Sequence, residues 1–284
     1  MSKVAVVTDS TSYIPKDYCQ KYNITLLPQV LIWGEQTFAD GVDIQPDEFY
    51  RRLSTAKVMP TTSQVPVPQM EKAFSSLLEQ GYEVLGIFIS SKLSGTFQSA
   101  IQGREMLASG KDKVEIVDSE STAMAMGFQA IAAARAAANG ASLTECRFIA
   151  EQARTRTGVY FVVDTLEFLH RGGRIGGAAR LIGTALGLKP ILAVQGGKVE
   201  PVERIRTKGK AMDRLVEIIA ELCKGKGAVE LATLHANAHD DAKLILENAS
   251  KALNVSEKLF TEVSPVVGAH TGPGTVGLAY MTEK

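Results

Sequence analysis

Two clusters of hydroxyl residues carry the clearest chemical signal in this sequence. The first lies in the turn SSKLSG at residues 90–95, which separates an apolar run of strand length at 84–89 from a helix-compatible segment beginning near Thr96. Glycine in such a turn lets the backbone approach a ligand closely, and the first N–H groups of a helix carry partial positive charge, so the turn is suited to an anion. Ser94 is therefore a candidate anion ligand, with helix capping by Ser94 or Thr96 as the alternative.

The second cluster is the run Thr61, Thr62 and Ser63, which lies between Pro60 and Pro66. One interpretation is that Ser63 caps the amphipathic helix that follows, a role that needs a single hydroxyl. The other interpretation is that the three side chains form a preorganised set of hydrogen-bond donors for a carboxylate or a phosphate. The segment alone leaves both open.

A histidine and an arginine pair could complete such a site. His270 lies in the glycine-rich sequence GAHTGPG at 268–274, which we interpret as a loop leading into the last strand. It is either a surface histidine or a donor brought against Thr62 and Ser94 from the other half of the chain. Arg171 and Arg174 flank two glycines, and they are either solvated or in contact with an anion or with the other half.

Several common chemistries lack their motifs. None of the Gly-Lys pairs is followed by Ser or Thr, and no GxGxxG pattern follows a strand, so neither standard nucleotide site is indicated. His235 and His239 are four residues apart, but Ala236 stands where a metalloprotease helix requires glutamate, and we expect no metal. Ser94 is not part of a GxSxG nucleophile elbow.

Composition and charge narrow the class of protein. The chain has 284 residues, 45% hydrophobic and 22% charged, with a formal net charge of zero, which argues against nucleic acid or an anionic membrane surface as the main partner. The three cysteines are far apart in the chain, so we expect no disulfide framework. The apolar run after the first residues is too short for a signal peptide, and Arg135 interrupts the alanine-rich segment 130–141. We expect a cytoplasmic protein without stable membrane insertion.

Strands and helices alternate through the first half of the chain. Apolar runs at 4–8, 84–89 and 114–117 end in Asp-Ser, Ser-Ser and Asp-Ser, and a helix is expected from about 122 to 139. Such spacing predicts a parallel sheet covered by helices on both faces. Because ligands of open α/β sheets lie outside the carboxyl ends of the strands, these hydroxyl residues are expected to line one crevice.

The pattern changes after residue 155. We expect a small-residue helix through Leu188, a hairpin around Gly196-Gly197, helices at 207–223 and 240–253, and strands at 229–234, 258–263 and 276–280. This indicates a mixed-sheet α/β fold. The predicted division is an N-terminal parallel-sheet α/β domain at 1–155 and a C-terminal mixed-sheet α/β domain at 156–284.

Five motifs in order give the chain a family resemblance. TDS at 8–10, PTTSQ at 60–64, LSGT at 93–96, RGGRI at 171–175 and GAHTGPGT at 268–275 resemble the DegV family, and they span essentially the whole chain. The resemblance implies two α/β domains that hold a long-chain fatty acid, such as palmitate, between them. Some members are the lipid-carrying subunit of a bacterial fatty acid kinase and present the carboxyl group to a separate ATP-binding kinase subunit.

The resemblance also implies roles for single residues. Thr62 and Ser94 would hold the fatty acid carboxylate, Thr61 and Ser63 would stand beside it, and His270 would add a contact. The arginines at the possible partner surface are Arg171, Arg204 and Arg206, which would engage the kinase subunit or the acyl-phosphate unless they are simply solvated. No catalytic residue, metal or cofactor is expected in this chain. The alternatives are an acyl hydrolase with Ser94 as nucleophile and His270 as base, and a binding module for a small phosphorylated metabolite.

Overall fold

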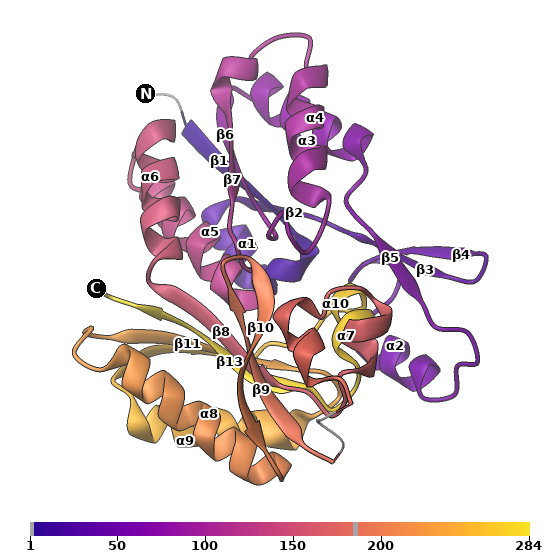
Figure 1. Cartoon of the computed structure of the whole chain (residues 1–284). Coiled ribbons are helices and arrows are strands. Elements are labelled where there is room, and N and C mark those ends of the chain that lie inside the picture. Colours follow the sequence, from indigo (N-terminus) through magenta and orange to yellow (C-terminus); the bar gives the residue numbers. More distant parts are fainter. Residues whose placement is uncertain (1–2, 184–186) are drawn as a thin grey trace.

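A computed structural model describes residues 3–183 and 187–284 and builds the chain from two α/β halves (Figure 1). The first half contains a parallel four-stranded sheet in the order β2-β1-β6-β7, as the sequence predicts. Its strands are β1 (Lys3–Asp9), β2 (Ile24–Leu27), β6 (Tyr82–Phe88) and β7 (Val114–Asp118).

Helices cover both faces of this sheet. Alternate residues of β1 belong to different cores, with Val4 and Val6 facing one and Ala5 and Val7 facing the other. The Ala5 side is covered by α3 (Val67–Glu79) and α4 (Thr96–Met106). The Val4 side is covered by α1 (Lys16–Tyr22), α5 (Ala123–Ala138) and α6 (Leu143–Arg154). Two short 3₁₀ segments, η1 (Ser10–Ser12) and η2 (Lys111–Lys113), complete the half.

A small antiparallel sheet, β4-β3-β5, stands beside the parallel one. It consists of β3 (Val30–Trp33), β4 (Gln36–Ala39) and β5 (Thr61–Ser63), and α2 (Pro46–Leu53) lies in the connection between β4 and β5. The expectation that Ser63 caps the next helix is wrong, because α3 begins after Pro66 and has no side-chain cap. Ser63 lies instead in a strand, paired with Val30.

The second half is a mixed six-stranded sheet in the order β10-β9-β8-β13-β11-β12, in which only β11 and β12 are parallel neighbours. The strands are β8 (Thr157–Val162), β9 (Lys189–Gln195), β10 (Lys198–Ile205), β11 (Val229–His235), β12 (Val255–Leu259) and β13 (Val276–Thr282). One face is covered by α8 (Lys208–Cys223) and α9 (His239–Ala252). The strand that we expected at 258–263 is β12, which lies at Val255–Leu259 and so begins and ends earlier in the chain.

Helix α5 joins the two halves. Its residues share one core with β1 of the parallel sheet and with the inner face of the mixed sheet, including Val159 and Ala279. The many alanines of α5 explain this position, since small side chains let backbone on both sides approach and close-pack. A helix that is apolar all round is buried, as its sequence indicates.

The segment around His270 differs from its prediction. It forms α10 (Pro265–Thr271), not a loop, with Pro265 in the first turn, where proline is tolerated. Gly268 stands inside this helix because a Cβ there would lie 2.5 Å from the Tyr50 hydroxyl. Two further short elements are α7 (Glu167–Arg171) and η3 (Gly176–Leu181). The small-residue helix that we expected through Leu188 begins as the 3₁₀ segment η3. Residues 184–186 of the expected helix lie outside the described residues.

None of the helices in the described part of the chain combines the length and the apolar character needed to cross a bilayer.

Candidate functional site

A cavity lined by both halves of the molecule contains four of the five predicted ligand-binding residues, Thr62, Ser63, Ser94 and His270. The space free of atoms within and in front of it, which includes open solvent, is about 860 Å³. Its walls are largely aliphatic, and the apolar side chains include Ile89, Leu93, Val159, Phe161, Val194, Val199, Leu234, Val263 and Val266. Five polar residues in contact with one another or with neighbouring backbone form what we call the polar region: Gln29, Thr62, Ser94, Arg174 and His270.

Thr62 and His270 meet in this region. Thr62 Oγ1, on β5, lies 2.7 Å from His270 Nε2, at the end of α10. Burial, with the positive charge of Arg174 as a second cause, lowers the pKa of His270 to about 4, so the ring is neutral near pH 7. Nδ1 is buried without a partner among the described residues. Because an orphaned N–H is rarer than an orphaned acceptor, we assign the proton to Nε2, which donates to Thr62 and leaves the Thr62 hydroxyl proton for a ligand.

Ser94 has a similar proton to offer. The backbone N–H of Thr96 donates to Ser94 Oγ at 3.3 Å, and the two hydroxyl oxygens lie 3.0 Å apart. Thr96 is fully buried, and Ser94 Oγ is the one acceptor within reach of its hydroxyl among the described residues, so we assign the Thr96 proton to Ser94. Ser94 Oγ therefore accepts twice and donates once, and the one acceptor facing that proton is Gln29 Oε1 at 3.5 Å. Helix α4 begins after Gly95 without a side-chain cap, so the capping alternative for Ser94 or Thr96 is wrong, and the ligand role of Ser94 stays a prediction.

The other two hydroxyl residues of the second cluster differ in whether they line the cavity. Ser63 lines the cavity with Thr62, whereas Thr61 is exposed and is not among the lining residues.

The three predicted arginines lie outside the cavity. Arg171 is exposed and pairs with Glu167 at 2.5 Å, while Arg204 and Arg206 are exposed at the end of β10 and just after it. The arginine that lines the cavity is Arg174, for which the sequence left open either a solvated position or contact with an anion or with the other half of the chain. The sequence RGGR does not indicate which of its two arginines, Arg171 or Arg174, is exposed and which lines the cavity.

Arg174 is held by backbone carbonyls. Its Nε donates to Leu93 O at 3.1 Å and its Nη1 to Gly172 O at 2.7 Å. No ion pair joins it to a carboxylate in residues 3–183 and 187–284. An arginine without an internal counter-charge beside two hydroxyl donors favours an anionic ligand group.

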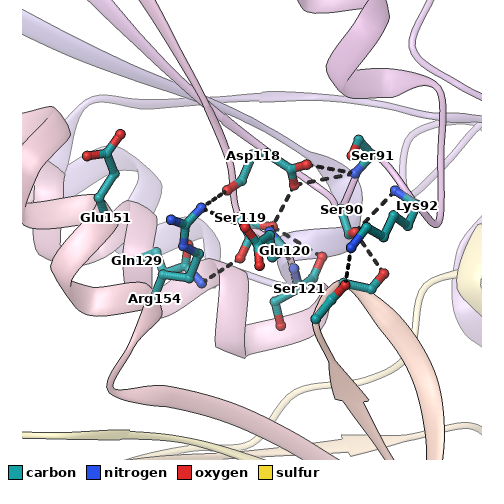
Figure 2. Close-up of polar contacts among 12 residues, drawn as sticks. Ser90, Ser91, Lys92, Asp118, Ser119, Glu120, Ser121, Gln129, Glu151 and Arg154 are labelled. Carbon is teal, nitrogen blue, oxygen red and sulfur yellow. Dashed lines mark hydrogen bonds and ion pairs between the residues drawn. The ribbon is translucent and has the colours of Figure 1, made fainter.

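The turn before Ser94 also fastens one wall of the cavity. The buried Ser90 hydroxyl donates to Gly197 O at 2.8 Å, and Lys92 Nζ donates to Gly196 O at 2.7 Å. Figure 2 shows Ser90 and Lys92 beside the Ser119–Ser121 turn, which belongs to the same network of polar contacts. Gly196 and Gly197 form the tip of the predicted β9–β10 hairpin, and both have positive φ, as a tight hairpin turn requires.

The Ser-His pair of the hydrolase alternative is not formed between the described residues. His270 Nε2 is occupied by Thr62, and no hydrogen bond between described residues joins His270 to Ser94. The pair His235 and His239 has its ring centres 5.9 Å apart, and the described residues contain no group of three or more His, Cys, Asp or Glu able to hold a metal ion.

Comparison with known proteins agrees with this architecture. The model of a family described as uncharacterised proteins of the DegV family matches residues 3–283. The chain belongs to the DegV family. A DegV domain-containing protein of Clostridium acetobutylicum is 38% identical over 283 residues, covering 99% of this chain and 98% of that one. Protein DegV of Bacillus subtilis is 34% identical over 281 residues, covering 98% of each chain.

Solved structures share the two-domain fold. A DegV family protein from Thermus thermophilus, described in terms of its fatty acid binding, superposes with a TM-score of 0.93 at 31% identity and 99% coverage of both chains. DegV of Bacillus subtilis, described as a fatty acid binding protein, superposes with a TM-score of 0.90 at 33% identity, covering 99% of this chain and 100% of that one.

Proposed function

We propose that this DegV-family protein binds a long-chain fatty acid, such as palmitate, with its chain in the cavity and its carboxylate in the polar region. The observation that carries the proposal is the combination of a largely apolar lining with two hydroxyls, those of Thr62 and Ser94, that can each donate to a ligand. Relatives described as fatty acid binding proteins support it.

The energetics suit a tightly held lipid. Burying about fifteen methylenes at roughly 0.8 kcal/mol each contributes ~12 kcal/mol before the costs of ordering and association are subtracted. The charged head then needs hydrogen bonds, because a buried unpaired carboxylate is expensive. Thr62, Ser94 and Arg174 supply donors, while neutral His270 orients Thr62 without adding charge.

The finer proposal concerns presentation of the head group. We infer that the protein acts as a carrier without catalysis of its own and presents the carboxyl group to a separate ATP-dependent fatty acid kinase subunit in the cytoplasm. The exposed Arg171, Arg204 and Arg206 would then contact that subunit or the acyl-phosphate, outside the cavity. The same proposal places the ligand between domains 1–155 and 156–284.

Mass spectrometry of the purified protein, first native and then denatured, tests lipid binding. A released long-chain fatty acid is expected, or its uptake after delipidation and incubation with palmitate. A protein that stays free of lipid in both experiments would overturn the proposal. Steady turnover of acyl esters abolished by Ser94→Ala would favour the hydrolase instead, and binding that phosphate competes for at every acyl length would favour the metabolite module.

A further inference from the structure

Gln29 occupies the junction between the two sheets of the first half. It follows Pro28, where the chain leaves β2 and enters β3, and it is 3% exposed while lining the cavity. All its polar atoms have partners: N donates to Ser10 Oγ at 3.1 Å, O accepts from Asp40 N at 2.9 Å, Nε2 donates to Asp9 Oδ1 at 3.2 Å, and Oε1 lies 3.5 Å from Ser94 Oγ. The residue thus links the TDS motif to the polar region.

Asp9 fixes the orientation of the Gln29 amide. The Asp9 carboxylate is 0% exposed, and its Oδ1 accepts from Thr11 N at 3.0 Å while its Oδ2 accepts from Ile89 N at 2.9 Å. Burial raises the pKa of Asp9, and the hydrogen bonds from these donors oppose that shift. Since Oδ1 is an acceptor, the Gln29 group that faces it must be the NH₂, and the amide carbonyl must face Ser94.

This arrangement directs the Ser94 proton into the cavity. Ser94 Oγ is filled as an acceptor by Thr96, so its proton points to Gln29 Oε1. An O···O distance of 3.5 Å is long for such a bond, which makes it weak. A carboxylate oxygen forms a shorter, charge-assisted bond and takes the proton over. Gln29 holds the hydroxyl in place and gives it up when a head group arrives.

We propose that Gln29, oriented by Asp9, is a positioning residue for Ser94 in recognition of the fatty acid head group. The inference rests on the proposed function and deepens it. It gives Asp9 of the TDS motif a role, orienting Gln29, although Asp9 itself is not proposed to contact the head group. It predicts that Gln29 acts through its hydrogen bonds and not through its volume.

The first test replaces Gln29 with methionine, which keeps the volume and loses the amide. Palmitate affinity, measured by titration of delipidated protein, is expected to fall about threefold, toward the low end of the value of one neutral hydrogen bond, because the Ser94 hydroxyl is no longer held for the head group. The matched control is Gln129→Met, which removes another fully buried glutamine with Nε2 bonds to Ser119 O and Thr157 Oγ1, outside the cavity. It is expected to change stability but to change affinity less than twofold.

The second test is the pH profile of Gln29→Glu. Burial and the neighbouring Asp9 raise the pKa of the new carboxyl group, which favours its protonated form at the acid end of a profile from pH 6 to pH 8.5. The protonated group donates to Asp9 and offers a carbonyl to Ser94, as glutamine does, whereas the ionised group, favoured as the pH rises, repels both Asp9 and the ligand. Asp40, Arg174 and His270 are the other charged or titratable groups around position 29, and the unmodified protein has them too. The palmitate affinity of Gln29→Glu is therefore divided, at each pH, by the affinity of the unmodified protein.

The outcomes separate this inference from the proposed function. Near-normal affinity of Gln29→Glu at pH 6 that is lost at pH 8.5, with Gln29→Met weak throughout, supports the positioning role. If Gln29→Met binds palmitate as well as the unmodified protein does, the positioning role is wrong but the proposed function stands. The same conclusion follows if the pH profile of Gln29→Glu is parallel to that of the unmodified protein. Failure of the unmodified protein to bind any fatty acid overturns the proposed function itself.

Discussion

Thr62 and His270 are 208 positions apart in the chain, yet their side chains meet at 2.7 Å inside the cavity. One comes from a three-residue strand of the small sheet and the other from the last turn of a seven-residue helix in the second half. The contact requires both halves to be folded and docked, so the polar region is a property of the whole chain.

Removal of either hydroxyl is expected to weaken fatty acid binding. Thr62→Val and Ser94→Ala each delete one hydrogen bond to a charged group, which corresponds to about 10- to 100-fold in affinity for palmitate. Titration of the delipidated variants measures the change. Thr61→Val is the matched control, since Thr61 is exposed on the same strand and does not line the cavity. Equal losses for Thr61→Val and Thr62→Val would contradict the assignment.

His270 is expected to make the protein sensitive to acid. Its pKa is lowered to about 4 in the folded state, against about 6.5 in the unfolded chain, so the unfolded state binds more protons between these values. Stability is therefore full above about pH 7.5 and falls as the pH drops, by about 2 kcal/mol at pH 5.

Urea unfolding of the unmodified protein and of His270→Gln at both pH values isolates this effect. The glutamine keeps a donor for Thr62 but does not titrate, so it should lack this part of the acid loss. An identical pH dependence for the two proteins would show that His270 is not held neutral by burial.

Gly172 is expected to tolerate no side chain. A Cβ built there overlaps His270 Nδ1, so Gly172→Ala must push the ring away from Thr62. The backbone at Gly172 is helical and suits alanine, which makes the expected loss of palmitate affinity purely steric. Gly209→Ala, in the first turn of α8 with no atoms near its Cβ position, should leave affinity unchanged. Full affinity in Gly172→Ala would rule out the ring position described.

The Ser90 bond is expected to hold the hairpin over the cavity. Ser90→Ala removes the bond to Gly197 O, worth about 1 kcal/mol, so hydrogen exchange at the hairpin tip should accelerate about fivefold. Thr275→Val is the control, because Thr275 is also buried and its hydroxyl donates to a carbonyl, that of Thr271, without a bond to Ser90 or to the hairpin. Equal acceleration in both variants would mean that the hairpin is not fastened by Ser90.

The sequence predicts those features that depend on local pattern. The parallel strands, the Gly196-Gly197 hairpin and the α8 helix follow from apolar periodicity and turn residues within short windows. The three-stranded sheet was missed because its strands have three or four residues and pair across long separations. The seven residues of α10 contain glycine and precede two more, so their composition favours a loop.

The hydroxyl residues that line the cavity were named from the sequence, whereas the residues that position them were not, and the role of each stays a prediction. Thr62, Ser63, Ser94 and His270 line the cavity, whereas Arg171 does not and Arg174 does. Two arginines three residues apart have the same sequence signal, and only hydrogen bonds to the Leu93 and Gly172 carbonyls distinguish the one that lines the cavity. Gln29 beside Pro28 carried no signal, since its role depends on four partners distributed over the first half of the chain.

The central claim is that the carboxyl group of a fatty acid lies between Thr62 and Ser94. The ¹³C NMR spectrum of palmitate labelled at its carboxyl carbon, bound to delipidated protein, tests this most directly. We expect one bound resonance, distinct from free palmitate, that moves in both Thr62→Val and Ser94→Ala and stays in place in Thr61→Val. A bound resonance that neither variant moves, or no bound resonance at all, would contradict it.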